Sequence, residues 1–390
     1  MTIKLEKSWI QQILYIFSVS IFLITKFIRM TCFSTFFSPR FDDCASYCVL
    51  LFALFSFYGR FRYKKTIFIV STFLVGISIL IYIRSSLSSL MVLLILIATA
   101  YKMDIKLILK IQMLIVALSI AIVILCSSTG IIPNLVFVKD ENYIYAMGFL
   151  NYATISYLTF GLNIIFFYTY QLNKRNLIIA LLVDTVIFLI FHNRLMYAVE
   201  LIYFVLILAT NKINMHKMRR LIIAFPWIAC FFSYILAKSY ERTNPIMYEL
   251  NLILSGRLYY GNNALKSISI DLFGKYIAMR GNIPIKEQSD LPYFYIDSGF
   301  LFSILSNGVI FTLIILIMYS IILHYALLKK NNLLVVTVVI ISIANMINNI
   351  WVTLIYCPFI LFFSEALEME IEYMKRRKKH IRFGEVYATK

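Results

Sequence analysis

Long apolar runs, separated by short polar and basic stretches, dominate the hydrophobic pattern of this chain. Runs of about 20 apolar residues are typical of transmembrane helices. The pattern predicts twelve membrane-crossing segments, at about 9–25, 44–58, 66–83, 86–100, 107–126, 153–170, 177–191, 195–209, 221–238, 298–323, 332–350 and 352–366. Because the runs are continuous rather than alternating, they favour helices over a β-barrel. The expected fold class is therefore all-α, a polytopic membrane protein with about 12 transmembrane helices.

Composition supports the same class of protein. The 390 residues are 61% hydrophobic and 14% charged, whereas an ordinary soluble domain is about 45–50% apolar and about 25% charged. The six cysteines lie mostly inside apolar runs and lack zinc spacing. We read them as small embedded hydrophobes rather than as a disulfide or metal framework. The sequence also lacks a Walker A loop, a GxGxxG motif and an HExxH motif, which argues against an ATP-driven pump or a nucleotide-sugar transferase, and it shows no strong metal-binding cluster.

Positive charge is distributed unevenly over the predicted loops. A net charge of +18 would fit a nucleic-acid-binding protein. If the N-terminus is cytoplasmic, however, 24 of the 37 lysines and arginines lie inside and 13 outside, as the positive-inside rule demands. We therefore expect both termini to be cytoplasmic, no nucleic-acid partner, and a basic C-terminal tail that is attracted to anionic lipid.

The longest interruption of the apolar pattern, at about 239–297, falls on the outer side of this topology. Loops of this length are usually functional or disordered. Apolar residues recur in it at near-helical spacing, which indicates short helices that lie on the membrane surface and pack back on the bundle. We therefore expect one integral-membrane domain over 1–390, with a large structured extracytoplasmic loop over 239–297 that carries part of an active site.

Arginines on the predicted outer surface are the first candidates for chemistry. Arg194 lies in a tight turn between two apolar runs, and Arg257 lies in the long loop within "LSGRLYYG" (254–261). Each side chain either snorkels to the interface or belongs to a phosphate clamp, because the planar guanidinium binds phosphate through two parallel hydrogen bonds.

Few acidic or imidazole groups accompany these cations. His192 precedes Arg194 by two residues, and a lone interfacial histidine is either structural or catalytic. Asp297 opens an apolar run, where it is either a partner of the helix N-terminus or a carboxylate base that lines an outer cavity. Asp184 and Glu200 fall inside apolar runs, so each is either a hydrogen-bonded structural group or part of a proton path.

Five short segments resemble, in order along the chain, motifs of the Wzy family of polysaccharide polymerases, which is related to the O-antigen ligases. They are "MGFLNYATISY" (147–157), "HNRLMYAVELI" (192–202), "LSGRLYYGNNALKSI" (254–268), "DLFGKYI" (271–277) and "YIDSGFLFSILSNGVIF" (295–311). The chain departs from the family pattern at Asn193, where serine is common, at Tyr259 or Tyr260, where the family has tryptophan, and at Ser298, where it has asparagine. The topology is also similar, with about a dozen spans and one large outer loop late in the chain.

The resemblance implies a glycosyltransferase of the bacterial cytoplasmic membrane that assembles capsule, exopolysaccharide or O-antigen. Its substrate would be an oligosaccharide on undecaprenyl pyrophosphate in the outer leaflet. Its other partners would be membrane lipid and the flippase and chain-length regulator of the same pathway. The enzyme would transfer glycan from the lipid pyrophosphate to a sugar hydroxyl of the incoming repeat unit, without a nucleotide, a metal or another cofactor.

The same resemblance implies roles for residues of this chain. Arg194 and Arg257 would neutralise the charge that develops on the leaving pyrophosphate. The candidate general bases are His192, Glu241 and Asp297. The candidate substrate-binding residues are Arg242, Lys266, Arg280, Tyr240, Tyr259 and Tyr260. The three tyrosines either stack on sugar rings or anchor the membrane interface.

Three alternatives share parts of this pattern. An O-antigen-ligase-like transferase would have the same fold and donor but another acceptor, and the sequence barely separates the two. A non-enzymatic flippase or transporter of lipid-linked oligosaccharide is disfavoured by the absence of an obvious inverted repeat and by cations that gather at the outer mouth. A membrane O-acyltransferase would favour an intramembrane histidine, which the sequence does not offer.

Overall fold

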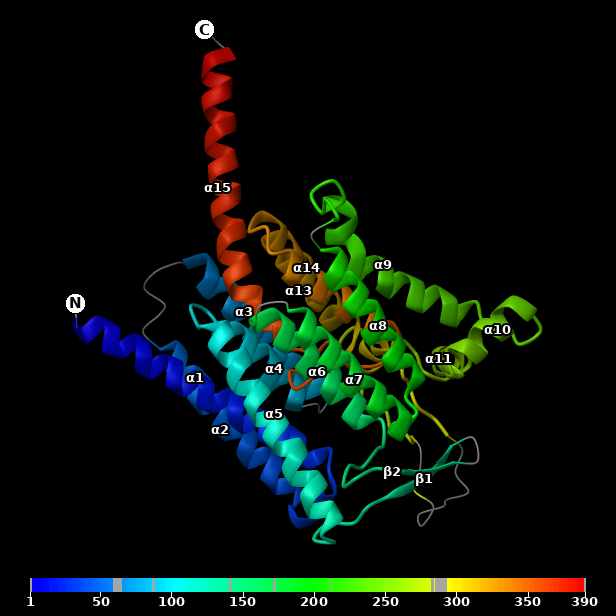
Figure 1. Ribbon diagram of the computed structural model, residues 1–390. Helices are drawn as coiled ribbons and strands as arrows, with labels where there is room; N and C mark the ends of the chain where they lie inside the picture. The colour runs from blue at the N-terminus through cyan, green and yellow to red at the C-terminus, as the bar shows by residue number, and fades with distance from the viewer. Residues whose placement is uncertain are drawn as a thin grey trace.

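The computed structural model describes residues 2–58, 65–85, 88–139, 142–170, 173–210, 212–281, 284 and 293–388. Within these ranges the chain is mostly helical, with one short β-hairpin, which confirms the all-α class (Figure 1). The α-helices are α1 (Thr2–Arg29), α2 (Pro39–Phe57), α3 (Lys65–Ser85), α4 (Ser88–Thr99), α5 (Ile105–Ser128), α6 (Thr154–Thr169), α7 (Lys174–Phe191), α8 (Arg194–Ala209), α9 (Arg219–Lys238), α10 (Pro245–Ile253), α11 (Arg257–Ser267), α12 (Gly299–Phe302), α13 (Val309–Leu328), α14 (Asn332–Ile347) and α15 (Phe363–Ala388). One antiparallel hairpin joins β1 (Val136–Lys139) to β2 (Asn142–Tyr145).

Five of the described helices, α1, α3, α5, α9 and α13, are long and apolar enough to cross a membrane. Helices α4, α6 and α14 are apolar but shorter. For example, the 12 residues of α4 span about 18 Å, well short of a hydrocarbon core of about 30 Å. The structure therefore supports a multi-pass membrane protein, but the count of about 12 spans is not confirmed.

Large apolar side chains on the outside of the bundle fit the same class of protein. Leu125 of α5, Val205 of α8 and Phe231 of α9 are 63%, 65% and 62% exposed. A water-soluble protein rarely leaves many such side chains uncovered, whereas lipid can cover them.

Side-chain caps explain where several helices begin. Asp104 accepts a hydrogen bond from the backbone of Leu107 at the start of α5, and Asn331 caps α14 in the same way. At α10, Asn244 is the N-cap and Pro245 is the first helical residue, a position where proline loses no helical hydrogen bond. These caps fix the polar ends between which the apolar runs form helices.

The last predicted span, 352–366, is not one helix. Irregular backbone runs from Asn348 to a short 3₁₀ helix, η4 (Pro358–Phe362), and α15 starts only at Phe363. The prediction failed because apolar composition does not reveal that side chains of other helices donate hydrogen bonds to the backbone carbonyls of this segment. Gln112 donates to the carbonyl of Leu354 at 2.7 Å, and Tyr319 donates to that of Trp351 at 2.8 Å. Irregular backbone at this depth is tolerated when protein buries and satisfies it.

Several segments that connect the helices meet at one end of the bundle (Figure 1). The end of α1 joins the segment after the hairpin, since the backbone N–H of Leu150 donates to the carbonyl of Met30. The hairpin reaches the α7–α8 turn, where Lys139 donates to the carbonyl of His192. The charge pattern predicts that this end is outer, and below we call it the predicted outer end.

The segment 239–297 also lies at this end and contains the short helices α10 and α11, as the near-helical spacing predicted. Its residues 282–283 and 285–292 are outside the described part of the chain. The remainder is anchored to the bundle, because Asn262 donates to the carbonyl of Ala237 at the end of α9. Its backbone at Lys275 also donates to the carbonyl of Ser306.

Candidate functional site

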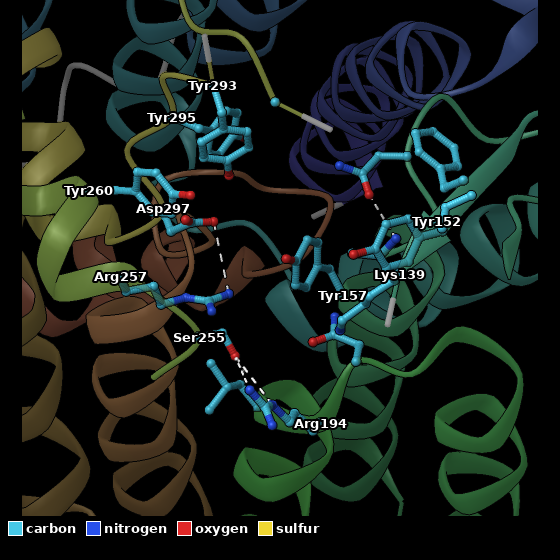
Figure 2. Close-up of a pocket in the computed structure, with 17 residues that line it drawn as sticks. Lys139, Tyr152, Tyr157, Arg194, Ser255, Arg257, Tyr260, Tyr293, Tyr295 and Asp297 are labelled. Atoms are coloured by element: carbon cyan, nitrogen blue, oxygen red, sulfur yellow. Dashed lines mark hydrogen bonds and ion pairs between the residues drawn. The ribbon is translucent and has the colours of Figure 1, made fainter. Parts of the chain in front are cut away.

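A cavity of about 420 Å³ opens at the predicted outer end. It lies between the hairpin, the start of α6, the α7–α8 turn, the α10–α11 junction and the strand-like segment before α12 (Figure 2). Its lining residues are Phe137, Val138, Lys139, Asn151, Tyr152, Ala153, Tyr157, Asn193, Arg194, Leu195, Ser255, Arg257, Tyr260, Gly281, Tyr293, Tyr295 and Asp297. The cavity therefore brings together Arg194, Arg257, Asp297 and Tyr260, which the sequence analysis had selected from three separate segments.

Arg257 is the most firmly held cation of the cavity. Its Nε donates to the carbonyl of Ile347 at 2.7 Å, its Nη1 to that of Leu254 at 3.2 Å, and its Nη2 to Oδ1 of Asn348 at 3.1 Å. The side chain is only 13% exposed. A guanidinium fixed in this way presents its charge to the cavity without having to reorganise when an anion binds.

The short sequence before Arg257 explains how this side chain is aimed. Ser255 and Gly256 both have positive φ angles, of 55° and 84°. Two successive left-handed residues break the chain between α10 and α11, and glycine adopts this conformation without steric cost. Helix α11 consequently starts at Arg257, so the side chain leaves the first turn of the helix toward the cavity.

Arg194 reaches the same junction from the other side. Its Nε and Nη2 donate to Oγ of Ser255 at 3.3 and 3.2 Å, and Nη2 also donates to the carbonyl of Leu252 at 3.3 Å. Arg194 begins α8, which Asn193 caps through a hydrogen bond to the backbone of Met196. Both arginines therefore bind the junction between α10 and α11, Arg194 through Ser255 and Arg257 through the carbonyl of Leu254.

The hairpin supplies a third cation. Lys139 lines the cavity, and its Nζ lies 5.9 Å from the centre of the Tyr152 ring and 2.8 Å from the carbonyl oxygen of His192. Among the described lining residues, three side chains are cationic and Asp297 is acidic. The resulting net charge of +2 on these lining side chains is suited to a ligand with about two negative charges, such as a diphosphate diester.

Asp297 is the carboxyl group of the cavity. Its Oδ1 lies 3.9 Å from Nη2 of Arg257, which is an ion-pair distance but too long for a hydrogen bond. Burial raises the pKa of Asp297, although the nearby charge of Arg257 acts to lower it. A carboxylate that is not bound tightly by its cation, and whose basicity is increased by burial, is suited to accept a proton from a substrate hydroxyl.

Tyrosines form the wall opposite Lys139. The ring centres of Tyr260 and Tyr293 are 4.6 Å apart, and those of Tyr293 and Tyr295 are 6.4 Å apart. Burial raises the pKa of Tyr293 and of Tyr295, so their hydroxyls keep their protons and can donate hydrogen bonds. Such a wall offers both aromatic faces and donors to sugar rings.

An apolar groove of about 280 Å³ adjoins this cavity. Its lining comes mainly from aliphatic residues of α8, α9, α11 and α14, including Ile202, Leu236 and Ile343. Arg257 and Leu195 line both the groove and the charged cavity. The two spaces together match a ligand that has an anionic head and an apolar chain.

The other predicted site residues lie outside the cavity. Tyr259 is 43% exposed and joins the aromatic cluster through Tyr260 (5.3 Å) and Tyr240 (6.3 Å). His192 contributes its carbonyl to Lys139 rather than a side chain to the lining. The remaining members of the predicted set have exposed side chains away from the lining, and they are Glu241, Arg242, Lys266 and Arg280.

Two acids of the predicted spans, Asp184 and Glu200, lie apart from the cavity. Both side-chain oxygens of Asp184 accept from Nδ2 of Asn163, at 2.9 and 2.8 Å. Glu200 is 4% exposed, and its Oε1 has no partner among the described residues. Neither acid lines the charged cavity, so the site does not use them.

Comparison with known proteins adds no identification. The chain matches no protein-family model, no curated protein and no solved structure. Among the described residues, no group of three or more His, Cys, Asp or Glu side chains could hold a metal ion. The fold and the cavity therefore define only a class, a helical protein of multi-pass membrane character with a cationic cavity beside an apolar groove.

Proposed function

We propose that this chain is a membrane glycosyltransferase of the polysaccharide-polymerase type. It joins oligosaccharide repeat units carried on undecaprenyl pyrophosphate, at the outer face of a bacterial cytoplasmic membrane, into capsule, exopolysaccharide or O-antigen. The five motif-like segments of the sequence motivate the proposal, and the arrangement of the cavity supports it independently.

One observation carries the proposal: Arg257 lines both a cationic cavity and an apolar groove. A ligand that fills both spaces has a headgroup of about two negative charges and a long aliphatic chain. A polyprenyl pyrophosphate has both features. In the proposed complex the prenyl chain enters the groove near Leu258, and the pyrophosphate lies between Arg194 and Arg257 with Lys139 facing it.

The reaction then follows from the chemistry of the lining. An acceptor sugar hydroxyl attacks the anomeric carbon of the lipid-linked glycan, and its proton passes to the carboxylate of Asp297. The bond between the anomeric carbon and the pyrophosphate oxygen breaks, and the lipid pyrophosphate leaves with the electron pair. The two guanidinium groups stabilise the charge that develops on the leaving oxygen. The tyrosine wall of Tyr260, Tyr293 and Tyr295 orients the sugars.

The test combines genetics with reconstitution. Deletion of the gene should leave surface glycan with single repeat units in place of a ladder on gels. The single lipid-linked units are then extracted from the deletion strain and added to the purified protein in lipid vesicles, where a ladder should form without a nucleotide. A flippase would instead leave no exported repeat units in the deletion strain. A ligase would leave full-length ladders that are not attached to their final acceptor.

A further inference from the structure

A second cavity lies at the predicted outer end, apart from the site described above, and its lining residues are half polar and half apolar. It has a volume of about 240 Å³ and is formed between the end of α1, the start of α4, α12 and the irregular segment after α14. Its polar lining consists of Lys26, Ser89, Asn307, Asn349 and Thr353. None of these residues lines the first cavity.

Asn307 is the strongest indication that this cavity binds something. The residue is fully buried, yet its Oδ1 and its Nδ2 both lack a hydrogen-bond partner among the described residues. Oδ1 of Asn349, in the same lining, is also buried without a partner. Leaving a buried polar atom without a hydrogen bond destabilises the fold, so three such atoms around one cavity indicate a polar ligand.

The backbone around Asn307 is also unusual. Asn307 ends a π-helical turn, η3 (Ser303–Asn307), and Gly308 follows with a φ of 93°. Turns of this type occur often at functional sites, because they reorient a side chain that a regular helix would point elsewhere. Here the turn separates α12 from α13 and leaves the Asn307 amide in the cavity lining.

Lys26 gives the cavity its charge. The ammonium group lies 5.7 Å from the centre of the Phe22 ring and forms no hydrogen bond or ion pair with the described residues. Asp42, the acid that acts on it electrostatically, is instead held by Arg29 at 2.8 Å. The cavity therefore presents one cation that has no hydrogen-bond or ion-pair partner among the described residues, together with amide and hydroxyl groups. This combination suits a phosphate-bearing headgroup that also has hydroxyls.

The two cavities lie on either side of one short segment. Asn348 accepts a hydrogen bond from Arg257 of the first cavity, and its neighbour Asn349 lines the second. At the other end, Met30 lines the second cavity and its carbonyl accepts from Leu150, next to Asn151 of the first. The second cavity is thus placed beside the first, at the same end of the bundle.

We infer that the second cavity binds the phosphate-bearing headgroup of a second lipid, the lipid-linked acceptor. This inference rests on the proposed function, because a polymerase that joins two lipid-linked units must hold two lipid headgroups at once. The first cavity has the charge for one pyrophosphate, and the second supplies a separate cation for the other. The acceptor's sugars then extend from Lys26 toward the tyrosine wall of the first cavity.

The test counts lipids and separates the two substrates. Purified protein in nanodiscs is titrated with undecaprenyl pyrophosphate, and bound lipid is counted by native mass spectrometry. Kinetics use a labelled acceptor-only analogue, in which a carbon atom replaces the oxygen between the sugar and the phosphorus, so that it cannot serve as donor. The variants are Lys26→Met, Lys26→Arg and Thr353→Val. The matched control is Lys110→Met, because Lys110 also lies 5.7 Å from an aromatic ring on a membrane-crossing helix and lines a different cavity.

The expected outcome is two bound pyrophosphate lipids for the wild type and for Lys110→Met, and one for Lys26→Met. The KM for the acceptor analogue should rise about tenfold or more in Lys26→Met, should rise less in Thr353→Val and should recover in Lys26→Arg, while the KM for the donor stays unchanged. If the wild-type protein polymerises but binds one pyrophosphate lipid, or if Lys26→Met leaves the acceptor KM unchanged, the inference is overturned. It is equally overturned if phosphatidylglycerol, and not the pyrophosphate lipid, is the molecule lost from Lys26→Met. If the wild type forms no polymer from extracted repeat units, the proposed function itself has failed.

Discussion

Replacement of Arg257 by alanine is the most direct test of the charged cavity. Its guanidinium is 13% exposed and held by three hydrogen bonds, to Ile347, Leu254 and Asn348. Removing one preorganised donor that stabilises a developing negative charge typically lowers kcat about 10²–10³-fold, or about 2.7–4 kcal/mol. We expect a loss of this size for Arg257→Ala, because the substitution also halves the net positive charge of the described lining.

The arginine-to-lysine variant separates charge from geometry. Lysine keeps the positive charge but presents three donors from a single atom, so it cannot reach the carbonyl of Ile347 and Oδ1 of Asn348 while facing the ligand. We therefore expect Arg257→Lys to recover only a minor part of the lost rate. Rate is measured as ladder formation from extracted lipid-linked repeat units in vesicles.

A matched control excludes general effects of removing a loop arginine. Arg242 belongs to the same long segment but is exposed and does not line the cavity, so Arg242→Ala should retain nearly full activity. Arg257→Ala removes the donor to the carbonyl of Ile347 and could therefore destabilise the fold. Melting temperatures of Arg257→Ala, Arg257→Lys and Arg242→Ala show whether each variant remains folded. A folded Arg257→Ala protein with a rate within threefold of the wild type would refute the proposed role, as would an equal loss in Arg242→Ala.

Three further predictions concern the base, the groove and the α10–α11 junction. Asp297→Asn should lower the rate about 10²–10⁴-fold. Because burial raises the pKa of Asp297 and only its carboxylate accepts a proton, wild-type activity should fall as the pH is lowered through that pKa. A flat pH–rate profile would contradict this role. Ala198→Trp should fill the apolar groove and raise the KM for the lipid-linked donor. The control Val205→Trp, on an exposed part of the same helix, should leave that KM unchanged. Equal donor KM values in the two variants would count against a lipid in the groove. Gly256→Ala forces a φ of 84° on a residue with a Cβ, which would lie 3.0 Å from the Tyr260 ring, so it should cost roughly 1–2 kcal/mol, seen as a lower melting temperature together with lower activity.

The sequence predicted most of the helices and part of the site. Helices need only the local apolar pattern and polar caps such as Asp104 and Asn331, both of which are visible in the sequence. Arg194 and Arg257 stood out because charged residues are scarce between apolar runs. The resemblance to the Wzy family implied that the two arginines act on one pyrophosphate and so lie close together. The contacts of both arginines at the α10–α11 junction support this closeness.

The residues that the sequence analysis missed depend on contacts between distant segments. Lys139 reaches the site only because the hairpin carries it to His192, 53 positions further along the chain. Ser255 lies inside the quoted motif, but its role follows from a left-handed φ of 55° that few residues other than glycine adopt. Tyr293 and Tyr295 lie just before Asp297, and the dense spacing of tyrosines there was the available signal.

The irregular segment after α14 unites these findings. A regular helix through Asn348 would place its carbonyls in internal hydrogen bonds and turn successive side chains by about 100°. Instead, the backbone at Asn348 is extended, and the side-chain oxygen of Asn348 accepts hydrogen bonds from Arg257 and Tyr157. The next residue, Asn349, lines the second cavity. The donors that stabilise this break, Gln112 and Tyr319, come from helices α5 and α13. Both cavities at the predicted outer end thus depend on a break in an apolar run, because the break lets the neighbouring residues Asn348 and Asn349 serve different cavities.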